Sequence, residues 1–163
     1  MKQLNWAVLG TGVIANEMAQ ALQKQGKSLY SVGNRTYEKA VAFGEQYGIS
    51  KVYTDFQQIF TDPEVDAIYI TTPHNTHREF MEMAIENGKH ILVEKSITLN
   101  SKELDEMIHL ADKKGVVIAE AMTIYHMPIY QKLKEIIQSG KIGKVNLITM
   151  NFGSLKEYDM KNR

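Results

Sequence analysis

A glycine-rich turn near the N-terminus has the residue types needed to bind phosphate groups. The segment Gly-Thr-Gly-Val-Ile-Ala at residues 10–15 follows a short apolar run and precedes an amphipathic stretch. Gly10 permits a tight turn, Gly12 lets a pyrophosphate approach the backbone, and Ala15 allows a helix to pack closely against a strand. Free N–H groups and the dipole at the start of that helix then favour an anion.

This turn predicts a dinucleotide-binding site. The predicted contacts from it are Gly10, Thr11, Gly12, Val13 and Ile14. Two alternatives stay open, which are a glycine turn required only for packing and a nucleotide site of the methyltransferase type. The strand-turn-helix context at the start of an α/β chain favours dinucleotide binding over both of them.

The residues after the second predicted strand bear on which dinucleotide binds. An NAD site usually carries an acid there, which binds the ribose hydroxyls. This strand instead ends in Asn34 and Arg35, and Glu38 lies in the first turn of the next helix, where its charge favours the helix dipole. Arg35 could pair with a 2′-phosphate, because its guanidinium is a planar fork of donors. The sequence therefore favours NADP over NAD as cofactor, with a solvated loop arginine as the alternative.

Two further polar segments follow the fourth and fifth predicted strands. Thr-Thr-Pro-His-Asn-Thr-His spans residues 71–77, and strand ends on this edge of the sheet face the cofactor. His74 and His77 have no carboxylate or thiolate partner nearby in sequence, so we expect helix capping or a cofactor-side contact and no metal. Glu94 and Lys95 follow the next strand. The lysine could donate a hydrogen bond to a substrate hydroxyl or carbonyl, the alternative being a solvated charge pair.

Short apolar runs alternate with amphipathic segments along most of the chain. The pattern predicts strands at residues 4–9, 28–32, 51–53, 67–70, 90–93 and 116–119. It predicts helices at residues 13–25, 37–47, 56–60, 76–87 and 101–114, with Thr36 and Asp55 as N-caps. Strands separated by helices in this way form βαβ units. The predicted fold class is therefore α/β, with a doubly wound parallel sheet of the Rossmann type.

The alternation of predicted strands and helices ends in the last quarter of the chain. Pro128 can open a helix that Gly140 ends. Residues 144–152 alternate in part between apolar and polar side chains, which predicts a strand with one buried face. This strand comes last and has no obvious partner.

The composition excludes several classes of protein. The chain has 163 residues, 19 Lys and Arg against 19 Asp and Glu, and no cysteine. Its hydrophobic fraction of 44% is ordinary for a globular protein and argues against disorder. Balanced charge argues against a nucleic-acid partner, and the absence of cysteine excludes a disulfide scaffold and thiolate chemistry. We find no long apolar run and no signal-peptide pattern, so we expect a cytoplasmic protein without a membrane partner.

Taken together, the motifs resemble the Gfo/Idh/MocA family of NAD(P)-dependent oxidoreductases. The segments that carry the resemblance occur in family order, at residues 10–15, 34–40, 71–77, 94–96, 120–128 and 139–145. The Glu-Ala-Met and the later proline of the fifth segment look most like the dihydrodiol dehydrogenase branch. The resemblance implies a Rossmann domain followed by an α/β domain with a large, open, mostly antiparallel sheet. It also implies hydride transfer between NAD(P) and a small-molecule substrate, namely a sugar, polyol or related hydroxy or carbonyl compound.

The resemblance also implies roles for individual residues. Lys95 matches the family's catalytic lysine. The implied cofactor contacts outside the glycine turn are Asn34, Arg35, Thr71, Thr72, Pro73, Asn75, His77, Glu94 and Lys95. Ser96 stands where the family has proline, so the sequence leaves open whether the cis peptide bond often associated with that proline is present.

Members of this family are considerably longer than the present chain, and their proton-transfer residue lies in the second half. We therefore expect residues 1–122 to form the NAD(P)-binding Rossmann domain. Residues 123–163 would form a connecting helix and the first strand of an incomplete, truncated substrate domain. Such a chain would bind cofactor without being catalytically complete. The alternative is a non-catalytic NADP(H) sensor or an interaction module, and a homo-oligomer is consistent with the resemblance because family members often pair through the second-domain sheet.

Overall fold

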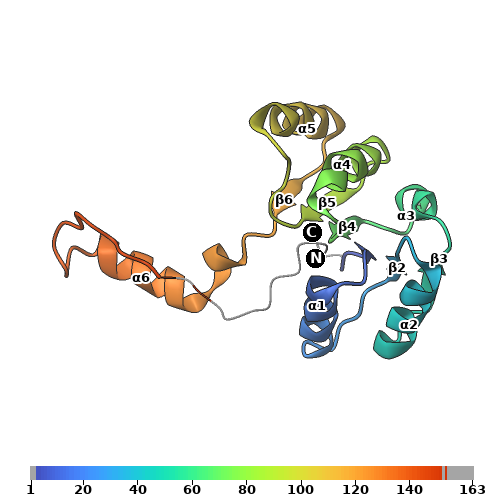
Figure 1. Cartoon of the computed structure of the whole chain (residues 1–163), viewed down its shortest axis with the longest axis horizontal. Coiled ribbons are helices and arrows are strands. Elements are labelled where there is room, and N and C mark those ends of the chain that lie inside the picture. Colours follow the sequence, from blue (N-terminus) through green and yellow to red (C-terminus); the bar gives the residue numbers. More distant parts are fainter. Residues whose placement is uncertain (1–2, 152, 154–163) are drawn as a thin grey trace. The chain divides into compact units, whose positions relative to one another are not determined.

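The structure is a computed structural model that describes residues 3–151 and residue 153. The chain divides into two compact units, Met1–Ala121 and Met122–Arg163 (Figure 1). Within the described residues, every strand belongs to the first unit, and the second unit contains a short 3₁₀ helix and one α-helix.

Six parallel strands form one sheet in the first unit. They are β1 (Trp6–Leu9), β2 (Ser31–Gly33), β3 (Lys51–Tyr53), β4 (Ala67–Ile70), β5 (His90–Val93) and β6 (Ile118–Glu120). Their order is β3-β2-β1-β4-β5-β6, and all neighbouring pairs are parallel. The strand order reverses between β1 and β4, which creates a crevice at the carboxyl ends of those two strands. The predicted doubly wound α/β fold is confirmed.

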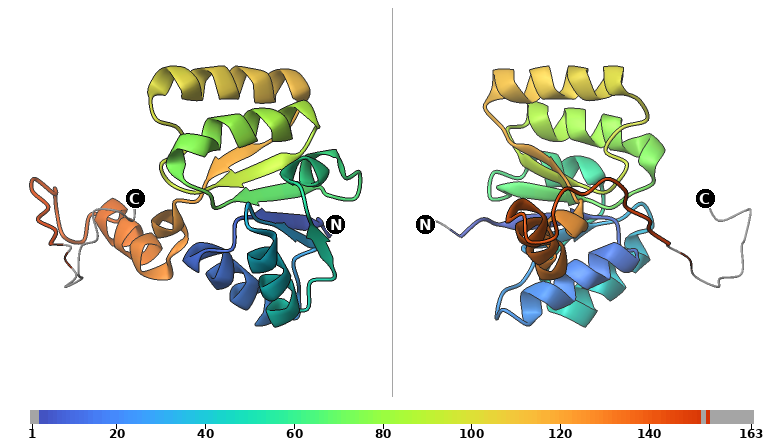
Figure 2. Two further views of the ribbon diagram at one scale, coloured as in Figure 1. Left: turned by 45° about the vertical axis from the view of Figure 1, so that its right-hand side comes forward. Right: turned by 90° about the vertical axis from the view of Figure 1, so that its left-hand side faces the viewer.

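Helices cover both faces of this sheet (Figures 1 and 2). One face carries α1 (Val13–Gln23) and α2 (Tyr37–Tyr47), and the other carries α3 (Phe56–Thr61), α4 (His77–Glu86) and α5 (Ser101–Lys114). Val8 of β1 packs in the apolar cluster with α1 and α2, whereas Ala7 and Leu9 pack in the cluster with α3, α4 and α5. Burial on both faces explains why β1 and β4 read as continuous apolar runs.

Side-chain caps fix the starts of two of these helices. Asp55 accepts a hydrogen bond from the backbone N–H of Gln57 at 3.1 Å and so caps α3, as predicted. Asn100 caps α5 in the same way by accepting from the N–H of Glu103 at 3.0 Å. Thr36 occupies the predicted N-cap position of α2, but its side chain accepts none of the free N–H groups of the helix. Thr36 instead borders the cavity at the sheet edge.

Three predicted strands begin too early. The segments predicted at 4–9, 28–32 and 116–119 form strands only over Trp6–Leu9, Ser31–Gly33 and Ile118–Glu120. Apolar side chains next to a strand can be buried without belonging to it. Leu29, for example, packs in the core cluster with α1 and α2 although it precedes β2. A run of apolar residues therefore shows which segment is buried, and the hydrogen-bonded strand within that segment can be shorter.

The second unit contains a 3₁₀ helix at Thr123–His126 and α6 at Pro128–Gln138. Pro128 lies in the first turn of α6, as predicted, where its missing N–H leaves no hydrogen bond unmade. The strand predicted at 144–152 is wrong for residues 144–151, which form no regular structure, and Phe152 lies outside the described residues. A strand needs a neighbour to bond with its N–H and C=O groups, and no described residue pairs with this segment. In the described part of the chain, α6 and the other helices are too short or too polar to cross a membrane.

Candidate functional site

A cavity opens at the carboxyl ends of β1, β2 and β4. Its volume is about 380 Å³, and it lies where the strand order reverses, which is the usual place for a ligand in a sheet of this kind. The predicted site residues that line it are Gly10, Thr11, Gly12, Asn34, Arg35, Thr71, Thr72, Pro73 and Asn75. Further lining residues were not predicted from the sequence, and these are Thr36, Lys39, Phe56, Thr76 and Phe80.

Gly10 makes the tight turn after β1, where only glycine fits. Its φ angle is +103°, a conformation that side chains disfavour. A Cβ atom at this position would also lie only 2.6 Å from Oγ1 of Thr71. The Thr71 N–H and hydroxyl both donate to the Leu9 carbonyl, at 2.9 and 3.0 Å. These contacts join the ends of β1 and β4 and leave no room for a side chain at the turn.

Gly12 has the opposite surroundings. Its backbone is extended, with φ −76° and ψ −171°, and a Cβ atom there would meet no protein atom within 4 Å. Neither backbone conformation nor packing within the chain therefore requires glycine at this position. A ligand that must approach the backbone does require it, because a side chain would occupy the space of the ligand. The turn thus fits a pyrophosphate, and the alternative of a turn needed only for packing does not explain Gly12.

The first turn of α1 presents backbone N–H groups without a side-chain cap. Such groups form a binding site for an anion. The carbonyls of the turn are held by Asn16, whose amide donates to Gly12 O at 2.8 Å and to Thr11 O at 3.3 Å. The Tyr47 hydroxyl of α2 in turn donates to Asn16 Oδ1 at 2.7 Å. The hydrogen-bond chain from α2 therefore fixes the carbonyls of the turn and leaves its N–H groups free for a ligand.

Two cations lie on the β2 side of the cavity. Arg35 follows β2, and Lys39 lies in the first turns of α2, so both side chains line the same wall. Neither forms an ion pair with a described residue, and no carboxylate is among the residues that line the cavity. The wall is therefore basic where a ribose-binding acid would stand in a typical NAD site.

Lys95 lies in the loop after β5, and hydrogen bonds of the preceding residue, Glu94, hold the start of this loop. The Glu94 N–H donates to the Ile70 carbonyl at 3.0 Å, and the Glu94 carboxylate accepts from the Tyr69 hydroxyl at 2.5 Å. Burial, followed by this bond, raises the pKa of Tyr69 above its usual range. The peptide bond between Lys95 and Ser96 is cis, which the serine at this position had not predicted.

Lys95 itself is exposed and makes no hydrogen bond or ion pair with any described residue. Its ammonium group is therefore available to a ligand at the carboxyl end of β5. Neither Glu94 nor Lys95 lines the cavity beside the glycine turn, and the same holds for Val13 and Ile14. Val13 is nevertheless 74% exposed at the start of α1, an unusual position for a large apolar side chain.

His77 lies beneath the loops rather than at the cavity wall. Its side chain is fully buried, and its two ring nitrogens are each 2.9 Å from a backbone carbonyl oxygen. Those oxygens belong to Thr72, in the loop after β4, and Ser96, in the loop after β5. The ring is thus fully engaged by the protein and offers no free atom to a cofactor.

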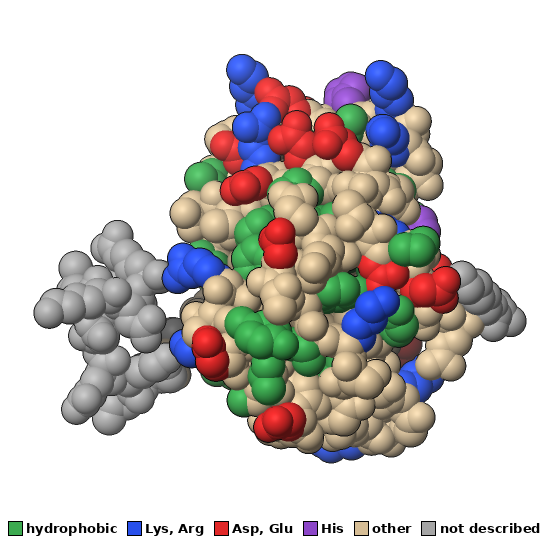
Figure 3. All heavy atoms as spheres, turned by 90° about the vertical axis from the view of Figure 1, so that its right-hand side faces the viewer, with side chains coloured by type: hydrophobic (Ala, Val, Ile, Leu, Met, Phe, Trp, Pro, Cys, Tyr) green, Lys and Arg blue, Asp and Glu red, His purple; other side chains and the backbone are tan. Residues whose placement is uncertain are grey.

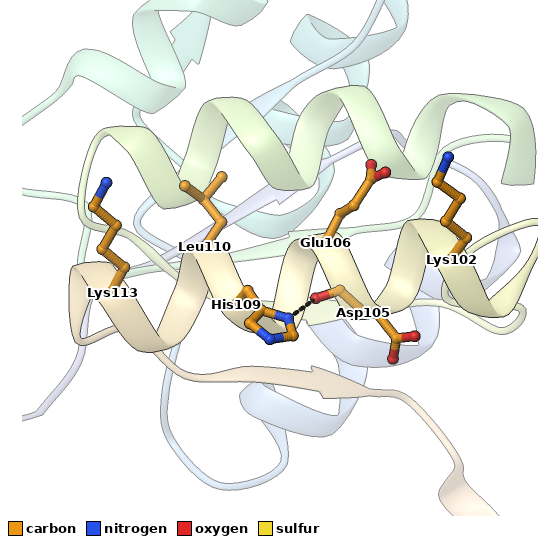
Figure 4. Close-up of a pocket in the computed structure, with 6 residues that line it drawn as sticks. All are labelled: Lys102, Asp105, Glu106, His109, Leu110 and Lys113. Atoms are coloured by element: carbon orange, nitrogen blue, oxygen red, sulfur yellow. Dashed lines mark hydrogen bonds between the residues drawn. The ribbon is translucent and has the colours of Figure 1, made fainter.

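A second hollow, of about 610 Å³, lies on the outer side of α5 (Figure 4). Its lining residues are Lys102, Asp105, Glu106, His109, Leu110 and Lys113, all from this one helix. His109 Nδ1 lies 2.7 Å from the Asp105 carbonyl, and Glu106 pairs with Arg78 of α4 at 2.9 Å. Figure 3 shows acidic and basic side chains interspersed over this end of the unit. A solvated charged helix face explains the hollow, so we place the functional site at the sheet edge instead.

In the described residues, no group of three or more His, Asp or Glu side chains is arranged to hold a metal ion. The polar groups at the sheet edge are instead backbone N–H groups, hydroxyls and the cations of Arg35, Lys39 and Lys95. Such groups bind phosphates and neutral oxygens.

Fold and site together define a nucleotide-binding domain of the Rossmann type. The chain belongs to the Gfo/Idh/MocA oxidoreductase family with the NAD-binding Rossmann fold, which matches residues 4–122. The resemblance seen in the motifs is therefore confirmed. Family membership implies binding of NAD(P), and the glycine turn fits that group.

Among its relatives is trans-1,2-dihydrobenzene-1,2-diol dehydrogenase of Xenopus laevis. It is 32% identical over 152 residues, which cover 91% of this chain and 46% of that protein. The scyllo-inositol 2-dehydrogenase (NADP(+)) of Bacillus subtilis is 31% identical over 150 residues, which cover 91% of this chain and 45% of that enzyme. A crystal structure of an NAD binding oxidoreductase from Klebsiella pneumoniae has a TM-score of 0.78 at 29% identity, covering 86% of this chain and 40% of that one. The chain thus spans about half the length of the relatives it matches.

Proposed function

We propose that the chain binds NADP(H) at the carboxyl edge of its sheet and forms the cofactor side of a hydride transfer. The observation that carries this proposal is the open space at Gly12, above a turn whose carbonyls are held away by Asn16. In this arrangement the pyrophosphate lies against Gly10, Thr11 and Gly12, with Val13 and Ile14 supplying N–H groups from the first turn of α1. Asn34 and Arg35 contact the adenosine end.

NADP is favoured over NAD because of the basic wall beside β2. Arg35 can form two parallel hydrogen bonds with a 2′-phosphate, and Lys39 adds a second positive charge. No carboxylate lines the cavity to bind the free ribose hydroxyls of NAD or to repel the extra phosphate. Lys39 thus joins Arg35 as a residue that distinguishes the two cofactors.

Lys95 is the proposed catalytic residue. A bound nicotinamide supplies the hydride donor or acceptor for the reaction. The Lys95 ammonium donates a hydrogen bond to the oxygen of the carbon that reacts, and so stabilises negative charge that develops there during reduction. The Tyr69–Glu94 bond holds the start of the loop, and Thr71, Thr72, Pro73 and Asn75 form the neighbouring wall of the cavity.

The substrate class is a sugar, polyol or related hydroxy or carbonyl compound. Support comes from relatives whose names specify a cyclic diol, scyllo-inositol and 1,5-anhydro-D-fructose. Each of these compounds presents oxygen atoms that a lysine ammonium can contact. In this proposal, residues 1–122 bind the cofactor, and residues 123–163 belong to the substrate domain.

Titration of the purified chain with NADPH and with NADH, followed by the fluorescence of the reduced nicotinamide, tests the proposed cofactor. We expect tighter binding of NADPH, and loss of binding of both cofactors in Gly12→Val, because the new side chain fills the ligand's space. The fold of this variant should persist, since a Cβ atom at Gly12 meets no protein atom. Ala119→Val, on the exposed edge strand β6, is the matched control. Full binding by Gly12→Val, or no binding by the unmodified chain, would overturn the proposal.

A further inference from the structure

The imidazole ring of His77 links two loops that border the proposed site. Its side chain is completely buried at the start of α4. Nε2 lies 2.9 Å from the carbonyl oxygen of Thr72, which precedes the cavity residue Pro73. Nδ1 lies 2.9 Å from the carbonyl oxygen of Ser96, the residue after Lys95. One side chain therefore spans from the cofactor wall to the loop of the catalytic lysine.

Both partners of this ring are acceptors. A backbone carbonyl oxygen cannot donate a hydrogen bond, and a neutral imidazole carries hydrogen on only one of its nitrogens. In a neutral ring, the lone pair of the second nitrogen would face the lone pairs of a carbonyl oxygen at 2.9 Å, without a hydrogen between them. Two good hydrogen bonds form only when both ring nitrogens carry hydrogen.

We propose that His77 is a positioning residue that, with hydrogen on both ring nitrogens, ties the loop after β4 to the loop that carries Lys95. This role rests on the proposed function, because the loops that His77 joins contribute Thr72, Pro73 and Lys95. The backbone of the lysine loop is held on its other side as well, since the Ile97 N–H donates to Glu120 Oε1 at 2.9 Å. His77 thus completes the support of the loop that carries Lys95, whose own side chain has no partner in the part of the chain that the structure describes.

Several titratable or charged groups lie on the elements around His77. They are His74, Arg78, Glu79, Glu94, Lys95 and Glu120. The exposed ring of His74 makes an edge-on contact with the ring of His77, with centroids 5.5 Å apart. The acids at 94 and 120 are bonded to Tyr69 and to the Ile97 N–H, respectively. Among the described residues, the polar contacts of the His77 ring nitrogens are the two carbonyl oxygens of Thr72 and Ser96.

Nitrogen-15 NMR of the histidine rings tests the proton assignment without any cofactor. The chain has five histidines, and replacing His74, His90, His109 and His126 one at a time by asparagine assigns the remaining signal to His77. Under the conditions of the cofactor titration, we expect both ring nitrogens of His77 to show the shift of protonated nitrogen. One protonated and one bare nitrogen in the folded chain under those conditions would overturn the assignment. The measurement is made on the wild-type ring, so it does not depend on whether a His77 variant folds.

The affinity for NADPH as a function of pH tests the positioning role. In the wild-type chain we expect affinity to fall roughly two- to tenfold, the value of one hydrogen bond, across the pH range in which the NMR signal shows His77 losing a hydrogen. His77→Asn, which keeps a single donor, should bind at the weaker level throughout and show no such step. His109→Asn, the same change on the exposed face of α5, should retain the step. A step that persists in His77→Asn would overturn the role, whereas failure of the wild-type chain to bind NADPH at any pH would overturn the proposed function and leave the NMR result standing.

Discussion

Strand β5 has a lysine directly before it and another shortly after it, and the two have opposite surroundings. Lys89 is 7% exposed, and its ammonium donates to the carbonyls of Asp62 and Val65 at 2.6 and 2.9 Å. Burial lowers the pKa of Lys89. Lys95 is exposed and has no partner among the described residues. A cation of the first kind holds the fold together, and a cation of the second kind is free to meet a ligand.

The same contrast holds for the two edges of the sheet. At the amino edge, Lys51 pairs with Asp62 at 2.6 Å and donates to the Tyr30 hydroxyl at 2.8 Å, while the Tyr53 hydroxyl also donates to Asp62. Burial alone would raise the pKa of Asp62, but the bonds from Lys51 and Tyr53 outweigh it and lower the pKa to about 2. At the carboxyl edge, Arg35 has no ion-pair partner in the described part of the chain. Lys51 and Asp62 are thus paired internally at the amino edge, whereas the guanidinium of Arg35 is left available at the carboxyl edge.

The largest expected effect is the difference in stability between variants of the two lysines that flank β5. Lys89→Met should reduce the free energy of unfolding by about 3 kcal/mol, because two buried carbonyls lose their donor. Lys95→Met should change it by less than about 0.5 kcal/mol, since an exposed side chain without partners is removed. Urea unfolding of both variants measures the difference. Equal losses of unfolding free energy in the two variants would contradict the contrast between Lys89 and Lys95.

The next effect concerns the acid at the amino edge. Asp62→Asn should cost on the order of 2 kcal/mol at neutral pH, which corresponds to the lowered pKa of this carboxyl. Because the folded-state pKa lies below the unfolded value of 3.8, this stabilisation is present above about pH 4 and lost as the pH falls through about 2. The wild type and the variant should therefore converge in stability at about pH 2. Asp105→Asn, on the exposed face of α5, should show neither effect.

A comparable effect on binding is expected at the carboxyl edge. Arg35→Ala should weaken NADPH binding by about thirtyfold, because charge-assisted bonds to the 2′-phosphate are lost, and should leave NADH binding within about twofold. Its effect on stability should be small, in contrast to the cations of the amino edge. Parallel titrations with the two cofactors measure this selectivity, with Lys102→Ala of α5 as the control. An equal loss for NADH would remove Arg35 from the recognition of the 2′-phosphate.

The smallest predicted effect on cofactor affinity concerns Tyr47, which acts on the glycine turn through Asn16. Tyr47→Phe removes the hydroxyl that orients Asn16 and should weaken NADPH binding by about fivefold, the value of one hydrogen bond. Tyr30→Phe removes a comparable hydroxyl at the amino edge, where it accepts a bond from Lys51, and should leave the affinity unchanged. Calorimetric titration can resolve this difference. A loss of affinity in both variants would point to a general loosening of the fold.

Much of the fold could be predicted from the sequence because its signals are local. Strand, turn and helix follow one another in βαβ units, and the glycine turn that includes Gly10 and Gly12 is contiguous in the chain. Arg35 could be predicted for the same reason, since it lies two residues after the end of a strand. The predicted strand at 144–152 failed because alternation shows which face of a segment is apolar and does not show whether a partner strand is present.

The missed features of the site depend on contacts between distant segments. Phe56 and Phe80 line the cavity from α3 and α4, and their rings meet edge to face with centroids 5.4 Å apart. Lys39 lines it because α2 places that residue on the same wall as Arg35. The position of His77 beneath the loops requires the carbonyl of Ser96, which lies nineteen residues further along the chain. No local pattern contains these distances.

The contrast between the two edges can be tested in one experiment, a backbone ¹H–¹⁵N NMR titration of the chain with NADPH. We expect large shifts for the amides of Gly10, Gly12 and Arg35, and no significant shifts for those of Asp62 and Lys89. Shifts centred on the amino edge or on the face of α5, or an unchanged spectrum at millimolar NADPH, would contradict the assignment of the cofactor site.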